Sequence, residues 1–172
     1  LVGKTRDTTA MAKNAGAGAA LAKLVGKNIR QLDVEMTVLA KHMKLLNDFA
    51  ANPVAHQNSM TKMSVDAAQR VRKAQDQSDK LWLALRKATE NLPKDERKRT
   101  RNELEKALAK TDAKITLAGK AAEGLYKKLE RVQKDKIIDS PAEGALQIVL
   151  VTLQALITAG KGWKKMRKRT LK

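Results

Sequence analysis

The chain has 172 residues, and its 36 lysines and arginines outweigh 18 aspartates and glutamates to give a net charge of +18. Apolar residues make up 42% and charged residues 31%, which is typical of a globular or coiled-coil domain and argues against a disordered chain. The chain contains no cysteine, which excludes disulfides, thiolate zinc sites and cysteine nucleophiles. We expect residues 1–172 to fold as one domain, with an aliphatic core because aromatic residues make up only 2%.

The first long helix is predicted over residues 8–51. Apolar or small side chains recur there in alternating steps of four and three residues, which defines the seam of a coiled-coil-like helix. The seam positions are Met11, Ala15, Gly18, Ala22, Val25, Ile29, Leu32, Met36, Leu39, Met43, Leu46 and Ala50. Each glycine here weakens the helix by about 1 kcal/mol relative to alanine. We therefore expect the part before Gly26 to be frayed, bent or packed tightly against a neighbour.

A second helix is predicted over residues 65–92, after a connection at 53–63 that begins with Asn52-Pro53. Ser64 is a good N-cap for it, because a serine hydroxyl can accept a hydrogen bond from a free amide of the first turn. Its seam reads Val71, Ala74, Ser78, Leu81, Leu85, Ala88 and Leu92. Pro93 stops this helix and suits the start of the next one.

The third helix, over residues 94–136, carries the strongest helical pattern in the chain. Eight of its nine seam positions are apolar; the nine are Leu104, Leu108, Thr111, Ile115, Ala118, Ala122, Leu125, Leu129 and Val132. A helix of this length spans on the order of 60 Å at 1.5 Å per residue.

The fourth helix is predicted over residues 141–160. Ser140 can cap it, Pro141 suits its first position, and Glu143 completes a capping box. Gly160 and Gly162 offer a stop, which leaves residues 161–172 as a basic C-terminal tail.

Residues 144–160 contain no charged side chain. A stretch of 17 residues is near the lower limit for crossing a bilayer, and Trp163, Lys164 and Lys165 follow it as interfacial anchors would. Polar residues recur within the stretch, however, and strong caps suit a helix in water. We therefore expect the most buried helix of a bundle here rather than a membrane helix.

Four amphipathic segments joined by short connections predict an all-α fold. We expect an elongated bundle of about four long helices, packed antiparallel along coiled-coil-like seams. No longer sequence repeat accompanies the heptads, which argues against a solenoid.

The sequence offers no catalytic or metal-binding pattern. His42 and His56 are the chain's histidines, and neither belongs to a Glu-x-x-His or His-x-x-x-His arrangement. We expect His42 on a helix flank and His56 in a loop. Gly-x-Gly occurs at residues 16–18 and 160–162, but without the preceding strand of a nucleotide-binding motif. We expect no enzymatic activity, no metal and no cofactor.

Basic residues concentrate at the start of the third helix, along that helix at i, i+4 spacing, and in the C-terminal tail. Such clusters bind phosphates by counterion release and read no bases. The candidate nucleic-acid or polyanion-binding residues are Arg97, Lys98, Arg99, Arg101, Lys106, Lys110, Lys114, Lys161, Lys164, Lys165, Arg167, Lys168, Arg169 and Lys172. A solvated charged surface without a partner is the alternative interpretation.

These patterns favour a non-enzymatic structural or assembly protein that binds nucleic acid or another polyanion without sequence specificity, as part of a homo- or hetero-oligomeric assembly. The first alternative is a membrane-associated or membrane-active bundle that uses residues 144–160 and meets an anionic membrane through the tail. The second is a helical adaptor for an acidic protein. Long, basic, alanine-rich helices of this kind resemble those of virion components, nucleoprotein assemblies and secreted helical toxins, in composition alone.

Overall fold

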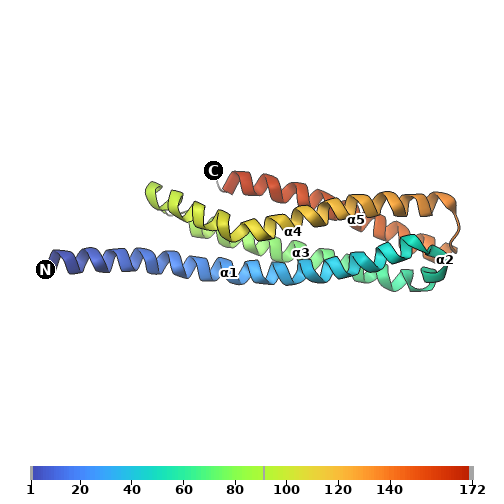
Figure 1. Ribbon diagram of the computed structural model, residues 1–172, viewed down its shortest axis with the longest axis horizontal. Helices are drawn as coiled ribbons and strands as arrows, with labels where there is room; N and C mark the ends of the chain where they lie inside the picture. The colour runs from blue at the N-terminus through green and yellow to red at the C-terminus, as the bar shows by residue number, and fades with distance from the viewer. Residues whose placement is uncertain (1, 91, 171–172) are drawn as a thin grey trace.

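The chain folds into long helices that run back and forth along one axis (Figure 1). The computed structural model describes residues 2–90 and 92–170, and the side chains of residues 23, 25–90 and 92–169. Its elements are α1 (Val2–Ala51), α2 (Pro53–His56), the 3-10 turn η1 (Gln57–Ser59), α3 (Met60–Glu90), α4 (Lys94–Asp135) and α5 (Ser140–Thr170). Over these described residues there is no strand, and the predicted all-α bundle is confirmed.

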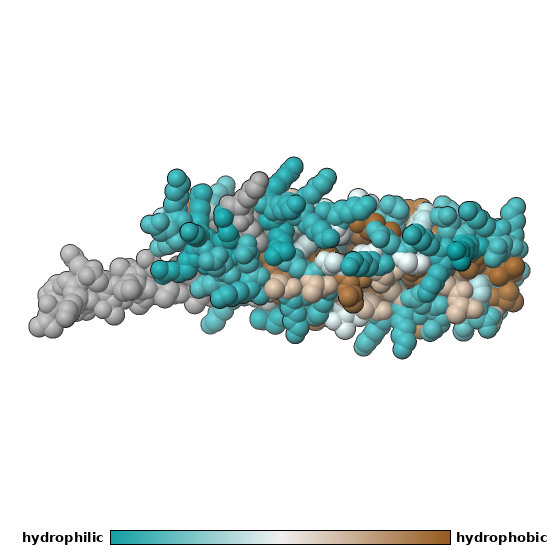
Figure 2. All heavy atoms as spheres, turned by 45° about the horizontal axis from the view of Figure 1, so that its top comes forward, coloured by the Kyte–Doolittle hydropathy of each residue, from teal (hydrophilic) through white to brown (hydrophobic). Residues whose placement is uncertain are grey.

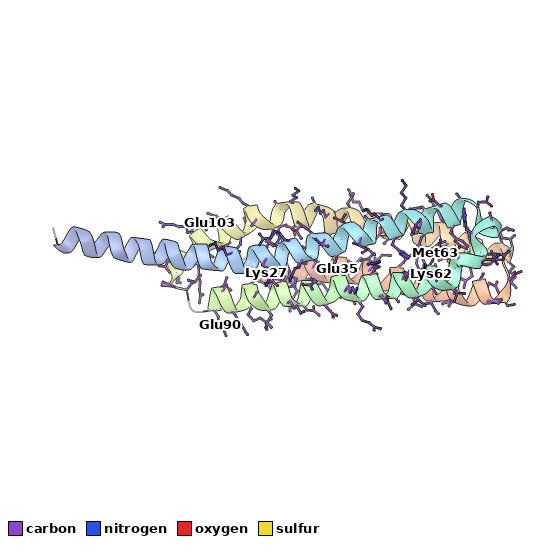
Figure 3. All side chains as sticks on the ribbon, turned by 90° about the horizontal axis from the view of Figure 1, so that it is seen from below. Lys27, Glu35, Lys62, Met63, Glu90 and Glu103 are labelled. Carbon is purple, nitrogen blue, oxygen red and sulfur yellow. The ribbon has the colours of Figure 1, made fainter. Side chains whose placement is uncertain are left out.

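The four long helices form a bundle in which each packs against two neighbours. The packed pairs are α1 with α3, α3 with α5, α5 with α4, and α4 with α1. The pairs α1–α3 and α4–α5 run antiparallel, whereas α1 and α4 run in the same direction (Figure 1). Figure 3 shows α3 and α4 on opposite sides of α1, so these two consecutive helices lie diagonally across the core.

The core follows the predicted seams. Every seam position from Val25 to Leu46 on α1 is buried, and Ala50 packs against the core. On α4, seven of the nine seam positions are buried, while Ile115 and Ala118 are half-buried against the core. The seam positions before Gly26 other than Val25 lie outside the described side chains. The backbone of α1 nevertheless continues as one helix through this segment and runs past the ends of the other helices (Figure 1).

The connection between α1 and α3 is more helical than the sequence indicated. Helix α3 begins at Met60, so Ser64 lies inside it, and its buried hydroxyl donates to the Thr61 carbonyl. The prediction that Ser64 caps this helix is therefore wrong. The reason is that α2 and η1 continue nearly helical backbone from Pro53 onward, so no capping residue is needed at position 64.

Helix α5 also differs from its predicted extent, because it continues through Gly160 and Gly162 to Thr170. Trp163 is only 4% exposed, and Met166 packs against the core. Burying side chains of this size contributes about 1.5–3 kcal/mol each, which offsets a glycine cost of about 1 kcal/mol per residue. Residues up to 170 therefore form a packed helix, and the prediction of a separate tail is wrong for them.

The uncharged part of α5 presents one face to the core and one to the surface. Val149 and Leu153 are buried, whereas Ile148 is 51% and Val151 is 60% exposed. By length and composition, the helix between Ser140 and Arg169 could cross a membrane, and half of its most apolar window is buried within the bundle. The structure therefore makes this stretch a core helix that also exposes an apolar strip.

Candidate nucleic-acid interface

The back-and-forth path of the chain brings its basic segments to one end of the bundle. Helix α3 ends, α4 begins and α5 ends there, beside the α1 segment that runs past them (Figure 1). We call this the basic end and define it as residues 23–30, 76–110 and 157–169. These residues include 19 lysines and arginines against seven aspartates and glutamates.

The opposite end of the bundle is electrically balanced. Residues 44–66 and 128–147, which surround the turns α1–α3 and α4–α5, contain six basic and six acidic side chains. Figure 2 shows hydrophilic side chains crowded over the basic end, and apolar surface nearer the middle and the far end. The excess positive charge is therefore a property of one end of the molecule, where its field adds up over a short distance.

Most of the predicted phosphate-binding residues are exposed at the basic end. The exposed ones are Arg97, Lys98, Arg99, Lys106, Lys110, Lys161, Lys164, Lys165, Lys168 and Arg169. Arg101 is half-buried. Arg97 Nη2 lies 3.4 Å from the Glu90 carbonyl oxygen across the α3–α4 connection. Lys172 lies outside the described residues.

Two of the predicted residues are already paired within the protein. Lys114 Nζ lies 3.7 Å from Asp33 Oδ2, and the Thr111 hydroxyl donates to the other oxygen of the same carboxylate at 3.1 Å. Arg167 Nη1 lies 2.9 Å from Asp112 Oδ2. These contacts join α4 to α1 and α5 to α4, so Lys114 and Arg167 hold helices together and are less available to a partner.

The basic residues of α4 and α5 meet along a flank that the sequence did not indicate. A recess of about 200 Å³ between the two helices is lined by Lys161 and Lys164 from α5 and by Lys120, Thr116 and Glu123 from α4. The i, i+4 spacing on α4 alone indicates the series Lys106, Lys110 and Lys114. Lys114, the last of these, faces α1, where it pairs with Asp33. Lys120 was missed because its partners come from another helix.

The histidines do not contribute to this surface. His42 is buried, and its Nε2 lies 3.0 Å from the Met63 carbonyl oxygen, so this nitrogen donates its proton to that oxygen. Burial lowers the pKa of His42, and the Met63 carbonyl partly opposes this effect. The expectation of a solvent-facing helix flank for His42 is wrong, because the start of α3, around Met63, covers that side of α1. His56 was expected in a loop, but it is the last residue of the short helix α2, where it is exposed. Among the described residues, no group of histidine and carboxylate side chains could hold a metal ion.

A comparison of the chain with protein-family models, with characterised proteins and with solved structures finds no match.

Proposed function

We propose that this protein is a non-enzymatic structural or assembly protein that binds nucleic acid, or a polyanion of similar charge density, through phosphate contacts at its basic end. The observation that supports the proposal is the asymmetry of charge along the bundle, 19 basic against seven acidic residues at one end and six against six at the other. A basic surface spread evenly over the molecule would be explained by solubility alone. The concentration of positive charge at one end favours a negatively charged partner that binds there.

The exposed outer face of α5 is the part of this surface best placed to meet phosphates. Lys161, Lys164, Lys165, Lys168 and Arg169 cover it over two turns, with no acidic side chain between them. The eight residue steps from Lys161 to Arg169 rise about 12 Å along the helix, a length over which one strand of a DNA duplex presents roughly three or four phosphates. Lysine and arginine side chains at this spacing release condensed counterions and carry no sequence information.

The proposal is tested by the salt dependence of binding to a DNA duplex. In one variant, the five α5 residues become glutamine: Lys161, Lys164, Lys165, Lys168 and Arg169. Each phosphate contact contributes about −0.9 to the slope of log K against log salt. We therefore expect fluorescence anisotropy titrations to show a slope flatter by up to about four units.

A matched control removes the same charge from the balanced end. It replaces five exposed residues there by glutamine: Lys44, Lys62, Lys128, Arg131 and Lys134. We expect its slope to change by less than about one unit. Equal effects of the two variants, or no binding of the wild type at about 50 mM salt, would rule out a phosphate-binding basic end. A strong preference for one DNA sequence would contradict the proposed mode of contact.

Deleting residues 161–172 is not a suitable test, although it removes these five charges together with Arg167 and Lys172. The deletion would also remove Trp163, whose indole N–H donates to Asp112, and Met166, which packs against the core. Loss of binding would then report unfolding as readily as loss of phosphate contacts. Circular dichroism spectra should confirm that both glutamine variants keep the helix content of the wild type.

Membrane association is the second candidate function, and the exposed apolar strip of α5 is the observation in its favour. Ile148 and Val151 lie at the surface of a helix long and apolar enough to span a bilayer. The lysines that follow would meet anionic lipid headgroups.

A further inference from the structure

A cavity of about 390 Å³ lies between α1, α3 and α5, with Ile115 of α4 also in its lining, and part of its wall belongs to the basic end. Its walls are mainly apolar and come from Leu32 and Met36 of α1, Val71 of α3, and Leu156 and Met166 of α5. Concave, largely apolar pockets of roughly 300–1,000 Å³ are the usual size of small-molecule sites, and helical bundles often build them between helices. The cavity is therefore large enough for a small organic molecule.

Both tryptophans of the chain line this cavity. Trp82 of α3 and Trp163 of α5 have ring centroids 4.7 Å apart and ring planes tilted by 57°. The Trp163 N–H donates to Asp112, but the buried Nε1 of Trp82 has no hydrogen-bond partner among the described residues. Trp82 is only 6% exposed, and a buried N–H without an acceptor is unfavourable. The two indole rings supply the aromatic part of the cavity wall.

The charged residues that line the cavity are both acidic, in a chain with twice as many basic as acidic residues. Asp76 and Asp79 stand one turn apart on α3, both are exposed, and neither forms an ion pair with another described residue. No lysine or arginine is among the described residues of the lining. An acidic rim over an aromatic interior disfavours anions and attracts cations, because indole faces are electron-rich.

We propose that this cavity binds a small lipophilic cation, in which an apolar or aromatic body carries a protonated or quaternary amine. The body occupies the space between Met36, Leu156 and Met166, and the amine lies near the indole rings and the two aspartates at the rim. This site takes a ligand of the opposite charge to the polyanion proposed for the exposed lysines of α5.

The intrinsic fluorescence of the protein tests this site directly, because its two tryptophans both line the cavity. The probe is a phenylalkyl trimethylammonium ion, compared with its uncharged tert-butyl analogue of the same shape and with a phenylalkyl carboxylate. We expect the ammonium ion to shift the fluorescence at saturation and to bind about tenfold more tightly than the uncharged analogue. The carboxylate should bind most weakly. Equilibrium dialysis measures the same affinities without relying on the tryptophans.

Two variants separate the rim from the cavity itself. Replacing Asp76 and Asp79 by asparagine should bring the affinities for the ammonium ion and its uncharged analogue within about twofold of each other. The matched control, Asp95→Asn with Glu105→Gln, removes two exposed acids of α4 outside the cavity and should keep the tenfold preference. Ser78→Leu adds apolar volume to the α3 wall and should weaken all three probes, with thermal unfolding confirming that this variant folds.

Three results would overturn the assignment. One is equal binding of the ammonium ion and its uncharged analogue by the wild type, which would make the cavity merely apolar. Another is the same loss of preference in the α4 control, which would attribute it to net charge. The third is no binding of any probe by the wild-type protein at millimolar concentration.

Discussion

Two aspartates connect the helices of this bundle at positions that the hydrophobic pattern does not reveal. Asp33 on α1 meets Thr111 and Lys114 of α4, and Asp112 on α4 meets Arg167 and the indole N–H of Trp163 on α5. The exposed fraction of the Asp112 side chain is 14%. Because an unpaired polar group at such a position costs roughly 1–3 kcal/mol, these contacts favour one helical register over its neighbours.

At the same scale, His42 makes the stability of the protein depend on pH. Burial lowers the pKa of His42 in the folded state, so below the ordinary histidine pKa of about 6.5 the unfolded chain binds the proton more readily. The free energy of unfolding should therefore fall as the pH falls from 7.5 to 5.5. Urea unfolding followed by circular dichroism should show a smaller loss for His42→Gln than for the wild type.

His56 provides the matched control for this prediction, because it is exposed. His56→Gln should lose as much stability as the wild type over the same pH range. If His42→Gln also follows the wild type, the pH dependence arises elsewhere and the role assigned to the buried imidazole is wrong.

At the scale of the element, α5 is the helix whose two faces decide between the candidate functions. Its buried face holds Val149 and Leu153 at the centre of the core, and its outer face exposes Ile148 and Val151. A core helix of a bundle in water needs an apolar buried face. A helix that also contacts lipid needs apolar side chains on its outer face as well.

Lysine substitutions on the two faces of α5 should therefore have different effects. Val149→Lys or Leu153→Lys forces an unpaired charge into the core and should lower the free energy of unfolding by about 3 kcal/mol or more. Ile148→Lys or Val151→Lys changes an exposed position and should alter it by no more than about 0.5 kcal/mol. Urea unfolding of the four variants in solution measures the difference.

The same four variants test the membrane alternative with anionic vesicles. Membrane association replaces polyanion binding as the proposed function if two results are found together. The wild type binds the vesicles, and Ile148→Lys and Val151→Lys do not, although both variants keep the stability of the wild type. If Val149→Lys and Leu153→Lys are as stable as the wild type, the assignment of α5 to the core is wrong.

At the scale of the whole molecule, the bundle is elongated and its charge is polarised along the long axis. The longest helix, α1, has 50 residues, which corresponds to about 75 Å. Because the excess charge lies at one end, an extended polyanion would approach the molecule there first. The homo- or hetero-oligomeric assembly stays a prediction.

Small-angle X-ray scattering measures this shape in solution. A compact domain of this length has a radius of gyration of about 16 Å. We expect a distinctly larger value and a maximum dimension on the order of 75 Å. A radius near the compact value, or substantial strand content by circular dichroism, would contradict the elongated helical bundle.

The sequence by itself was sufficient to predict the long helices and their buried faces. A heptad pattern is a local property, so the positions from Val25 to Leu46 and from Leu104 to Val132 identify the core before any helix is placed beside another. The sequence likewise predicted which segments are basic. Charge counts and i, i+4 spacing depend on the chain order alone.

Tertiary structure decided which of these segments meet. No local pattern indicates that α3 and α4 lie diagonally, that Lys120 of α4 joins Lys161 and Lys164 of α5, or that both basic segments share one end. Tertiary structure also decided that α5 continues through Gly160 and Gly162, although glycines favour a helix end at these positions. The physical reason is one of magnitude: helix propensities differ by about 1 kcal/mol per residue, and burying Trp163 against a neighbouring helix outweighs them.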